Sequence, residues 1–236
     1  MEDDSRLRSI HASAIALNNI GVHFLEKGAF ELALASLKNS IRVLQRVTCD
    51  HLSTVEFELE VNLLLKQASR QMCLPLQPVS RAPVTVLGYD HGLATFHPDR
   101  TLPTTEQSYA IQIEDVTEFQ QNQLDIHIAI VLQNLALAHL FFFKMATGPE
   151  DVPRAQGAAI EIAMLSCSIV ARIASEEMST EYALGIAALT CLFQNLMAAG
   201  RVAEAEDTLS RLQCLIHEEE RTNEMLLVTS NVASAA

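Results

Sequence analysis

Apolar residues recur at intervals of three and four along most of the chain, a period that predicts amphipathic helices. In chain order, the pattern predicts helices over residues 5–26, 30–47, 53–72, 115–145, 154–174, 179–199 and 202–216. A last stretch, residues 218–232, either continues the preceding helix or forms one of its own. Seven or eight helices joined by short turns make an all-α fold the expected class.

One segment, residues 74–108, lacks the helical period. It holds five of the seven prolines, Pro75, Pro78, Pro83, Pro98 and Pro103. Because proline breaks a helix interior, we expect an inserted Pro-containing loop, with short extended pieces at PVTVLGY and YAIQI. A loop that lies free of the helices is the expected arrangement. The alternative is a loop that lies in a groove and blocks it, with VTVLGY and LATF as its apolar anchors.

Two helix–turn–helix segments carry their landmark residues at the same offsets. The first reads Leu17-x-x-Ile20-Gly21-x-x-Phe24, then Gly28, Ala33 and Leu37, and the second reads Leu189-x-x-Leu192-Phe193-x-x-Leu196, then Gly200, Ala205 and Leu209. A third and weaker copy begins at Leu132, with its turn stretched by GPEDVPRAQG. These offsets resemble the tetratricopeptide repeat, whose pattern is W-x2-L-G-x2-Y…A-x3-F…P. The match departs from that pattern at Leu17 and Leu189, which stand at the tryptophan site, and at Gln45 and His217, which stand at the proline site.

The resemblance implies a single TPR-like helical domain over residues 1–236, with repeat-like hairpins at 14–47, 129–170 and 186–219. Its antiparallel helix pairs would stack as a short right-handed solenoid, interrupted by the loop. It also explains Gly21, an interior helical glycine that costs about 1 kcal/mol relative to alanine. Opposite Ala33, this glycine lets two helices approach closely. We therefore expect Gly21→Leu to destabilise the hairpin, and Gly21→Ala to be mild or stabilising.

The resemblance further implies that the first helix of each pair lines a concave groove that holds a partner peptide or protein. The matching positions are Asn18, Asn19, Val22, Glu26, Gln133, Asn134, Leu137, Thr190, Gln194 and Met197. Amide and hydroxyl side chains can hydrogen-bond a peptide main chain whatever its sequence. The alternative is that these polar residues face water or a neighbouring helix. The set contains no lysine or arginine, which argues against a clamp for a carboxylate.

A net charge of −13 disfavours nucleic acid and anionic membrane surfaces as partners. Residues 128–146 are almost wholly apolar, yet four polar residues within them favour a buried core helix over a membrane span, and YALGIAALTCLFQNLMAAG is interpreted in the same way. The five cysteines form no C-x-x-C pair, so free thiols in a reducing compartment are expected. The acidic start, MEDDSRLRSI, is unlike a signal peptide, which predicts a cytoplasmic or nuclear location.

Candidate chemistry is sparse. TFHPDR contains the His-Pro-Asp of J-domain co-chaperones, but the basic helix that this family needs before the tripeptide is missing. Four residues of the loop, Asp90, His91, His97 and Asp99, fit no familiar zinc framework. Linear motifs of hydrolases, nucleotide-binding loops and zinc proteases are absent from the sequence. We expect no enzymatic activity, no cofactor and no metal.

The sequence thus favours an interaction module that presents a concave groove to a partner peptide or protein. The alternative is a structural subunit of a homo-oligomer or hetero-oligomer, which would associate through the apolar helices IAIVLQNLALAHLFFF and YALGIAALTCLF. A third class, an enzyme whose site is assembled from distant residues, would need a cleft of titratable groups that the sequence does not reveal.

Overall fold

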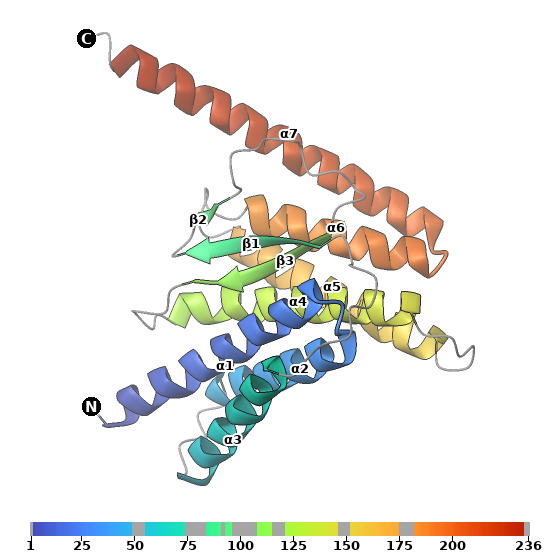
Figure 1. The fold of residues 1–236 in the computed structure, drawn as a ribbon. Helices are drawn as coiled ribbons and strands as arrows, with labels where there is room; N and C mark the ends of the chain where they lie inside the picture. The colour runs from blue at the N-terminus through green and yellow to red at the C-terminus, as the bar shows by residue number, and fades with distance from the viewer. Residues whose placement is uncertain are drawn as a thin grey trace.

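A computed structural model describes residues 2–48, 55–73, 84–90, 93–95, 108–114, 121–145, 152–174 and 182–233. Within these ranges the chain forms seven helices and one small sheet (Figure 1). The elements are α1 (Glu2–Glu26), α2 (Phe30–Thr48), α3 (Val55–Met72), β1 (Val84–Asp90), β2 (Leu93–Thr95), β3 (Ser108–Ile113), α4 (Gln121–Met145), α5 (Val152–Ala174), α6 (Tyr182–Ala198) and α7 (Val202–Ala233). The predicted helical class is confirmed, and α7 runs without a break through the predicted gap at residue 217.

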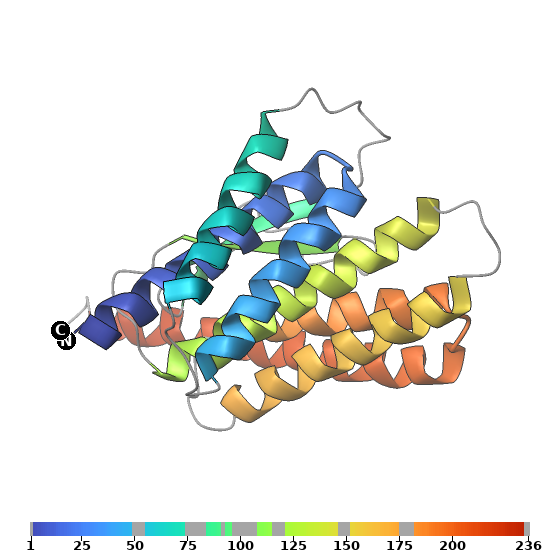
Figure 2. The same ribbon diagram turned by 90° about the horizontal axis from the view of Figure 1, so that it is seen from below.

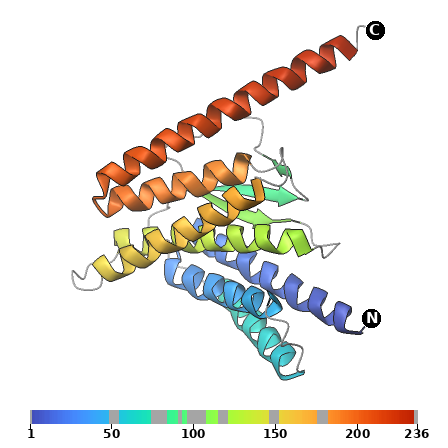
Figure 3. The same cartoon turned by 180° about the vertical axis from the view of Figure 1, so that it is seen from behind.

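The helices form two layers. Helices consecutive in sequence pack on each other, α1 on α2, α4 on α5 and α6 on α7, and further contacts join α2 to α4 and α5 to α6 (Figure 2). Of the described helices, α1, α4 and α6 contact the sheet, whereas α2, α5 and α7 do not (Figure 3). Helix α3 lies against α1 and α2 at one end of the array. The layer of α1, α4 and α6 is therefore the surface on which the sheet rests.

Equal offsets in the sequence produce the same turn twice. Gly28 and Gly200 have φ angles of 71° and 72°, in the left-handed region that favours glycine. In each turn, the residue after the glycine donates its N–H to the carbonyl five residues earlier, as in Ala29 to Phe24 at 2.9 Å and Arg201 to Leu196 at 2.9 Å. This bond is the signature of a Schellman motif, which ends a helix at glycine.

Gly21 of α1 lies against the side chain of Leu37 of α2. A Cβ atom at this position would lie 2.6 Å from Cγ of Leu37, a fully buried side chain. The predicted close approach is therefore present, but the neighbour that fills the space is Leu37 and not Ala33. The α2 side chains also reach the α1 backbone, since Ser36 and Ser40 donate to the carbonyls of Leu17 and Ala14 at 2.8 Å and 2.7 Å.

The structure changes the expectation for Gly21→Ala. The added methyl group meets the branch point of a buried leucine, so we expect the free energy of unfolding to fall by about 1–3 kcal/mol through overpacking. Gly157 on α5 is a matched control because, apart from its own helix backbone and chain neighbours, no described atom lies within 4 Å of its Cβ position. Gly157→Ala should instead stabilise by about 0.5–1 kcal/mol. Chemical denaturation of both variants decides the point, and equal effects at the two glycines would contradict the close approach.

The sheet has the strand order β2-β1-β3. Strands β1 and β3 are parallel, from Val84 opposite Ser108 to Tyr89 opposite Ile113, and β2 pairs with the end of β1 in the antiparallel sense. The extended pieces predicted at PVTVLGY and YAIQI are thus confirmed. The expectation of a free loop is wrong for β1, where Leu87 and Tyr89 are each only 5% exposed. The other residues of 74–108, apart from β2 and Ser108, lie outside the described ranges.

Among the described residues, two helices are long and apolar enough to cross a membrane, judged by length and composition alone. In the more apolar one, Gln123–Met145 of α4, 72% of the best window is buried inside the protein, as in the core helix of a globular fold. In the other, Gln156–Ile173 of α5, only 33% of the window is buried. The apolar character of α4 follows from its central position, where it contacts α1, α2, α5, α6 and the sheet.

Candidate functional site

Five side-chain amides surround strand β3. We call Asn18 and Asn19 of α1, Gln133 and Asn134 of α4, and Gln194 of α6 the amide cluster. Each member makes a hydrogen bond to a β3 residue. The three helices belong to the layer that contacts the sheet, so residues far apart in sequence converge on one strand.

Asn134 binds one residue of β3 through both of its amide atoms. Its Oδ1 accepts from the N–H of Ile111 at 2.9 Å, and its Nδ2 donates to the C=O of the same residue at 2.8 Å. This pairing reproduces the two bonds that a neighbouring strand would make. Asn134 is fully buried, so both bonds are shielded from water.

Asn19 repeats the arrangement two residues further along. Its Oδ1 accepts from the N–H of Ile113 at 3.0 Å, and its Nδ2 donates to the C=O of Ile113 at 2.7 Å. Asn18 joins the two asparagines, because its Oδ1 accepts from Asn134 at 2.9 Å and its Nδ2 donates to Asn19 at 3.2 Å. The same Nδ2 lies 3.2 Å from the C=O of Ile111. The three asparagines therefore form one connected network.

The glutamines bind the start of the strand. Gln133 donates from Nε2 to the C=O of Tyr109 at 2.8 Å, and Gln194 accepts from the hydroxyl of Ser108 at 2.8 Å. The other polar atom of this side chain, Oε1 of Gln133, is also buried. Within the described part of the chain, no group donates a hydrogen bond to it. The bonds that Asn18, Asn19, Gln133 and Asn134 make to β3 all go to main-chain atoms.

The geometry of an extended strand explains the spacing. Main-chain groups of alternate residues point to the same edge, so residues 109, 111 and 113 all present N–H and C=O to the helices. The opposite edge of β3 pairs with β1. The helical amides thus take the place of a neighbouring strand on the helix-facing edge of β3. Both edges of β3 are therefore hydrogen-bonded.

The side chains of β3 add apolar burial to these bonds. Ile111 and Ile113 are each 1% exposed, Tyr109 is 5% exposed and Ala110 is fully buried, whereas Gln112 faces solvent. Burying an isoleucine side chain contributes about 1.5–3 kcal/mol. Hydrogen bonds fix the position of the strand, and its apolar side chains supply much of the energy that holds it there.

The ten residues predicted for a groove have different surroundings. Five of them form the amide cluster. Val22, Leu137 and Thr190 are buried, while Glu26 and Met197 are exposed. For the cluster, the predicted ability to bind an extended main chain is realised by a strand of the same chain. The sequence analysis did not identify β3 as the occupant, although the alternation of apolar residues in YAIQI was a usable signal.

A pair of buried histidines joins α1 to α4 near the sheet. The Nδ1 atom of His127 lies 3.0 Å from Nε2 of His11, and the ring of Tyr89 in β1 meets His127 edge-on. Burial lowers the pKa of His11 to about 4. The His11 ring is therefore uncharged at neutral pH.

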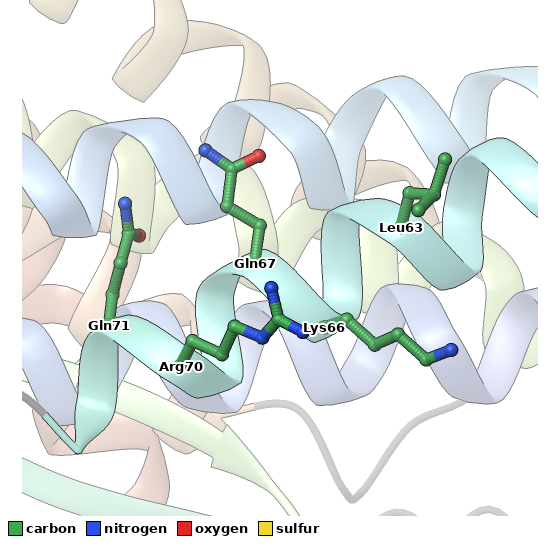
Figure 4. Close-up of a pocket in the computed structure, with 5 residues that line it drawn as sticks. All are labelled: Leu63, Lys66, Gln67, Arg70 and Gln71. Atoms are coloured by element: carbon green, nitrogen blue, oxygen red, sulfur yellow. The ribbon is translucent and has the colours of Figure 1, made fainter.

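Other candidate sites are weak. A surface concavity is lined by five side chains of α3, and among the described residues no second element converges on it (Figure 4). These side chains are Leu63, Lys66, Gln67, Arg70 and Gln71. Burial raises the pKa of the Cys167 thiol to about 12, and it raises that of Cys191 too, so neither is a thiolate at neutral pH. Among the described residues, no three His, Cys, Asp or Glu side chains gather as a metal site. His91, His97 and Asp99 lie outside those residues.

Comparison with known proteins gives no family for this chain. No family model, no curated protein and no solved structure matches it. The amide cluster and its strand are therefore the observations on which a function can be built.

Proposed function

We propose that this chain is a protein interaction module whose groove, formed by α1, α4 and α6, binds an extended polypeptide segment through its main chain. The proposal is based on the hydrogen bonds of Asn134 and Asn19. Each asparagine binds both the N–H and the C=O of one residue of β3, and the two bound residues alternate along the strand. Side chains that can satisfy both N–H and C=O of a residue suit any segment in the extended conformation.

We also propose that the helices form TPR-like antiparallel pairs, stacked as a short right-handed solenoid. The matching turns at Gly28 and Gly200 and the close approach at Gly21 support this arrangement. In such an arrangement the first helix of each pair lines the concave face, and α1, α4 and α6 are the helices that contact the sheet.

The chemistry of the cluster suits a polypeptide better than a charged ligand. All five members are uncharged amides, and three of them, Asn18, Gln133 and Asn134, are fully buried. A phosphate or carboxylate group would need cationic partners, which the cluster lacks. Neutral main-chain N–H and C=O groups form hydrogen bonds with buried amides and carry a smaller desolvation penalty than a charged group.

Selection of random peptides tests the proposal. Displayed peptides are selected against the intact chain, and their affinities are measured again with an Asn19→Ala, Asn134→Ala double variant shown to be folded by circular dichroism. Peptides that use the groove should bind the double variant at least about tenfold more weakly, which corresponds to 1.4 kcal/mol. An Asn62→Ala variant of the exposed face of α3 serves as the control and should leave affinity unchanged. Enriched peptides that bind all three proteins equally would contradict the proposal.

A second candidate, the structural subunit, is favoured by exposed apolar side chains. Leu63 of α3 is 67% exposed, and Leu59, Met164 and Leu165 are each at least half exposed. A contact between chains that buries these side chains would have to persist on dilution. Light scattering over a concentration series tests this alternative, which requires an oligomer throughout and loses its support if the chain is monomeric.

A further inference from the structure

We infer that β3 is a resident competitor in the groove, and that the partner is an extended segment of similar pattern that binds beside β1 by taking the place of β3. The inference rests on the proposed function and specifies the chemistry of the partner. The partner segment would carry an aromatic or large aliphatic residue at every second position. A small residue would follow the first of these large residues, as in YAIQI.

The contacts of β3 explain why it can be replaced. Asn18, Asn19, Gln133 and Asn134 all bind main-chain atoms of β3, and Gln194 binds the Ser108 hydroxyl. A segment of different sequence can form these main-chain bonds equally well. The parallel pairing of β3 with β1 also uses only main-chain groups. These main-chain bonds do not depend on the sequence of the strand, so the side chains of β3 determine which segments can replace it.

Burial along β3 defines that pattern. Tyr109, Ile111 and Ile113 share one face and are almost fully buried, so a competitor needs apolar side chains at these positions. Ala110 faces the other way and is also fully buried, so a competitor with a residue as small as alanine there fits without a change in packing. Gln112 is exposed, so its position tolerates any residue.

Tethering gives β3 an advantage that a partner has to overcome. A segment joined to its own binding site acts at an effective concentration in the millimolar range, which weakens the apparent affinity of any competitor. The buried Oε1 atom of Gln133 offers one way to overcome it, because no described group donates to this acceptor. A partner with a side-chain donor near the Tyr109 position would gain a hydrogen bond that β3 does not make.

The experiment uses the full chain and a labelled peptide with the sequence of residues 106–114, EQSYAIQIE. Peptide binding is measured by fluorescence anisotropy with the parent protein, with Ile111→Ser, and with Gln112→Ser. The Ile111 change weakens the resident strand and leaves the helices intact, so the peptide should bind this variant at least about tenfold more tightly than the parent. Gln112→Ser is the matched control on the exposed face of the same strand and should bind like the parent.

A second measurement needs no variant, so a folding defect in Ile111→Ser leaves the inference open to disproof. In the parent protein, a saturating concentration of the peptide should accelerate hydrogen exchange at the Ile111 and Ile113 amides of the chain, because displacement removes their bonds to Asn134 and Asn19. Binding that leaves these amides protected would show that the peptide adds to another surface, and it would overturn the inference.

The outcomes also separate this inference from the proposed function. If the β3 peptide does not bind, but selected peptides of another pattern depend on Asn19 and Asn134, the inference fails and the proposed function stands. If no selected peptide depends on these asparagines, both fail.

Discussion

Replacing Asn134 with alanine is expected to lower the free energy of unfolding by about 3 kcal/mol, a large share of the stability of a typical domain. The substitution leaves the N–H of Ile111 and the Oδ1 of Asn18 without these partners, in a region that water does not reach. Each buried polar group left unsatisfied costs about 1–3 kcal/mol. Urea denaturation monitored by circular dichroism measures the change.

Asn195 on α6 is a matched control for this prediction. It is also a buried asparagine, but its side chain donates to the carbonyl and the thiol of Cys191 in its own helix. Within the described part of the chain, no hydrogen bond joins it to β3. Asn195→Ala should therefore cost about 1 kcal/mol. If Asn134→Ala were as mild as Asn195→Ala, the asparagine network would not be what holds β3.

Acidification from pH 7 to pH 4.5 is expected to destabilise the fold by several kcal/mol. Burial lowers the pKa of His11 to about 4, and burial together with the charge of Lys38 lowers that of His139 to about 4, against 6.5 in the unfolded chain. Between pH 6.5 and pH 4 the unfolded chain binds protons at these histidines that the folded chain does not bind. The contribution of the two uncharged histidines to the free energy of unfolding is therefore fully present above pH 6.5 and is lost as the pH decreases toward 4. His11 alone contributes about 3 kcal/mol to this loss, at roughly 1.4 kcal/mol for each pKa unit.

Urea denaturation at a series of pH values checks the acid dependence. His11→Gln removes a titrating group, so the loss of stability between pH 7 and pH 4.5 should shrink by about 3 kcal/mol. Asn62→Ala changes an exposed residue of α3 without a titratable group and should leave the loss unchanged. An equal pH dependence in the parent protein and in His11→Gln would mean that folding does not change the pKa of His11, and it would contradict the prediction.

Helices were predictable from the sequence because each buries one face, and that requirement fixes a period of three to four residues. The turns at Gly28 and Gly200 were predictable because only glycine readily adopts a positive φ angle at the end of a helix. The partner of Gly21 was not predictable to the residue. Identifying Leu37 depends on the direction in which a side chain leans from its helix, which the periodicity of the sequence does not specify.

The amide cluster was predictable as a set of residues able to bind a main chain, but its occupant was not. Strand β3 has six residues, too few for a firm distinction between a strand and a loop, and its partner β1 lies 18 residues or more away along a proline-containing segment. Pairing between such distant segments depends on the three-dimensional fold, because it arises only when α1, α4 and α6 present their amides together.

Amide hydrogen exchange on the intact chain, resolved for each residue of β3, tests most directly whether side-chain amides hold this strand. We predict that Ile111 and Ile113 exchange as slowly as buried amides of α4 such as that of Leu135, and that Asn134→Ala accelerates exchange at Ile111. Exchange at Ile111 and Ile113 as fast as in an unstructured peptide would contradict the binding of β3 by the amide cluster.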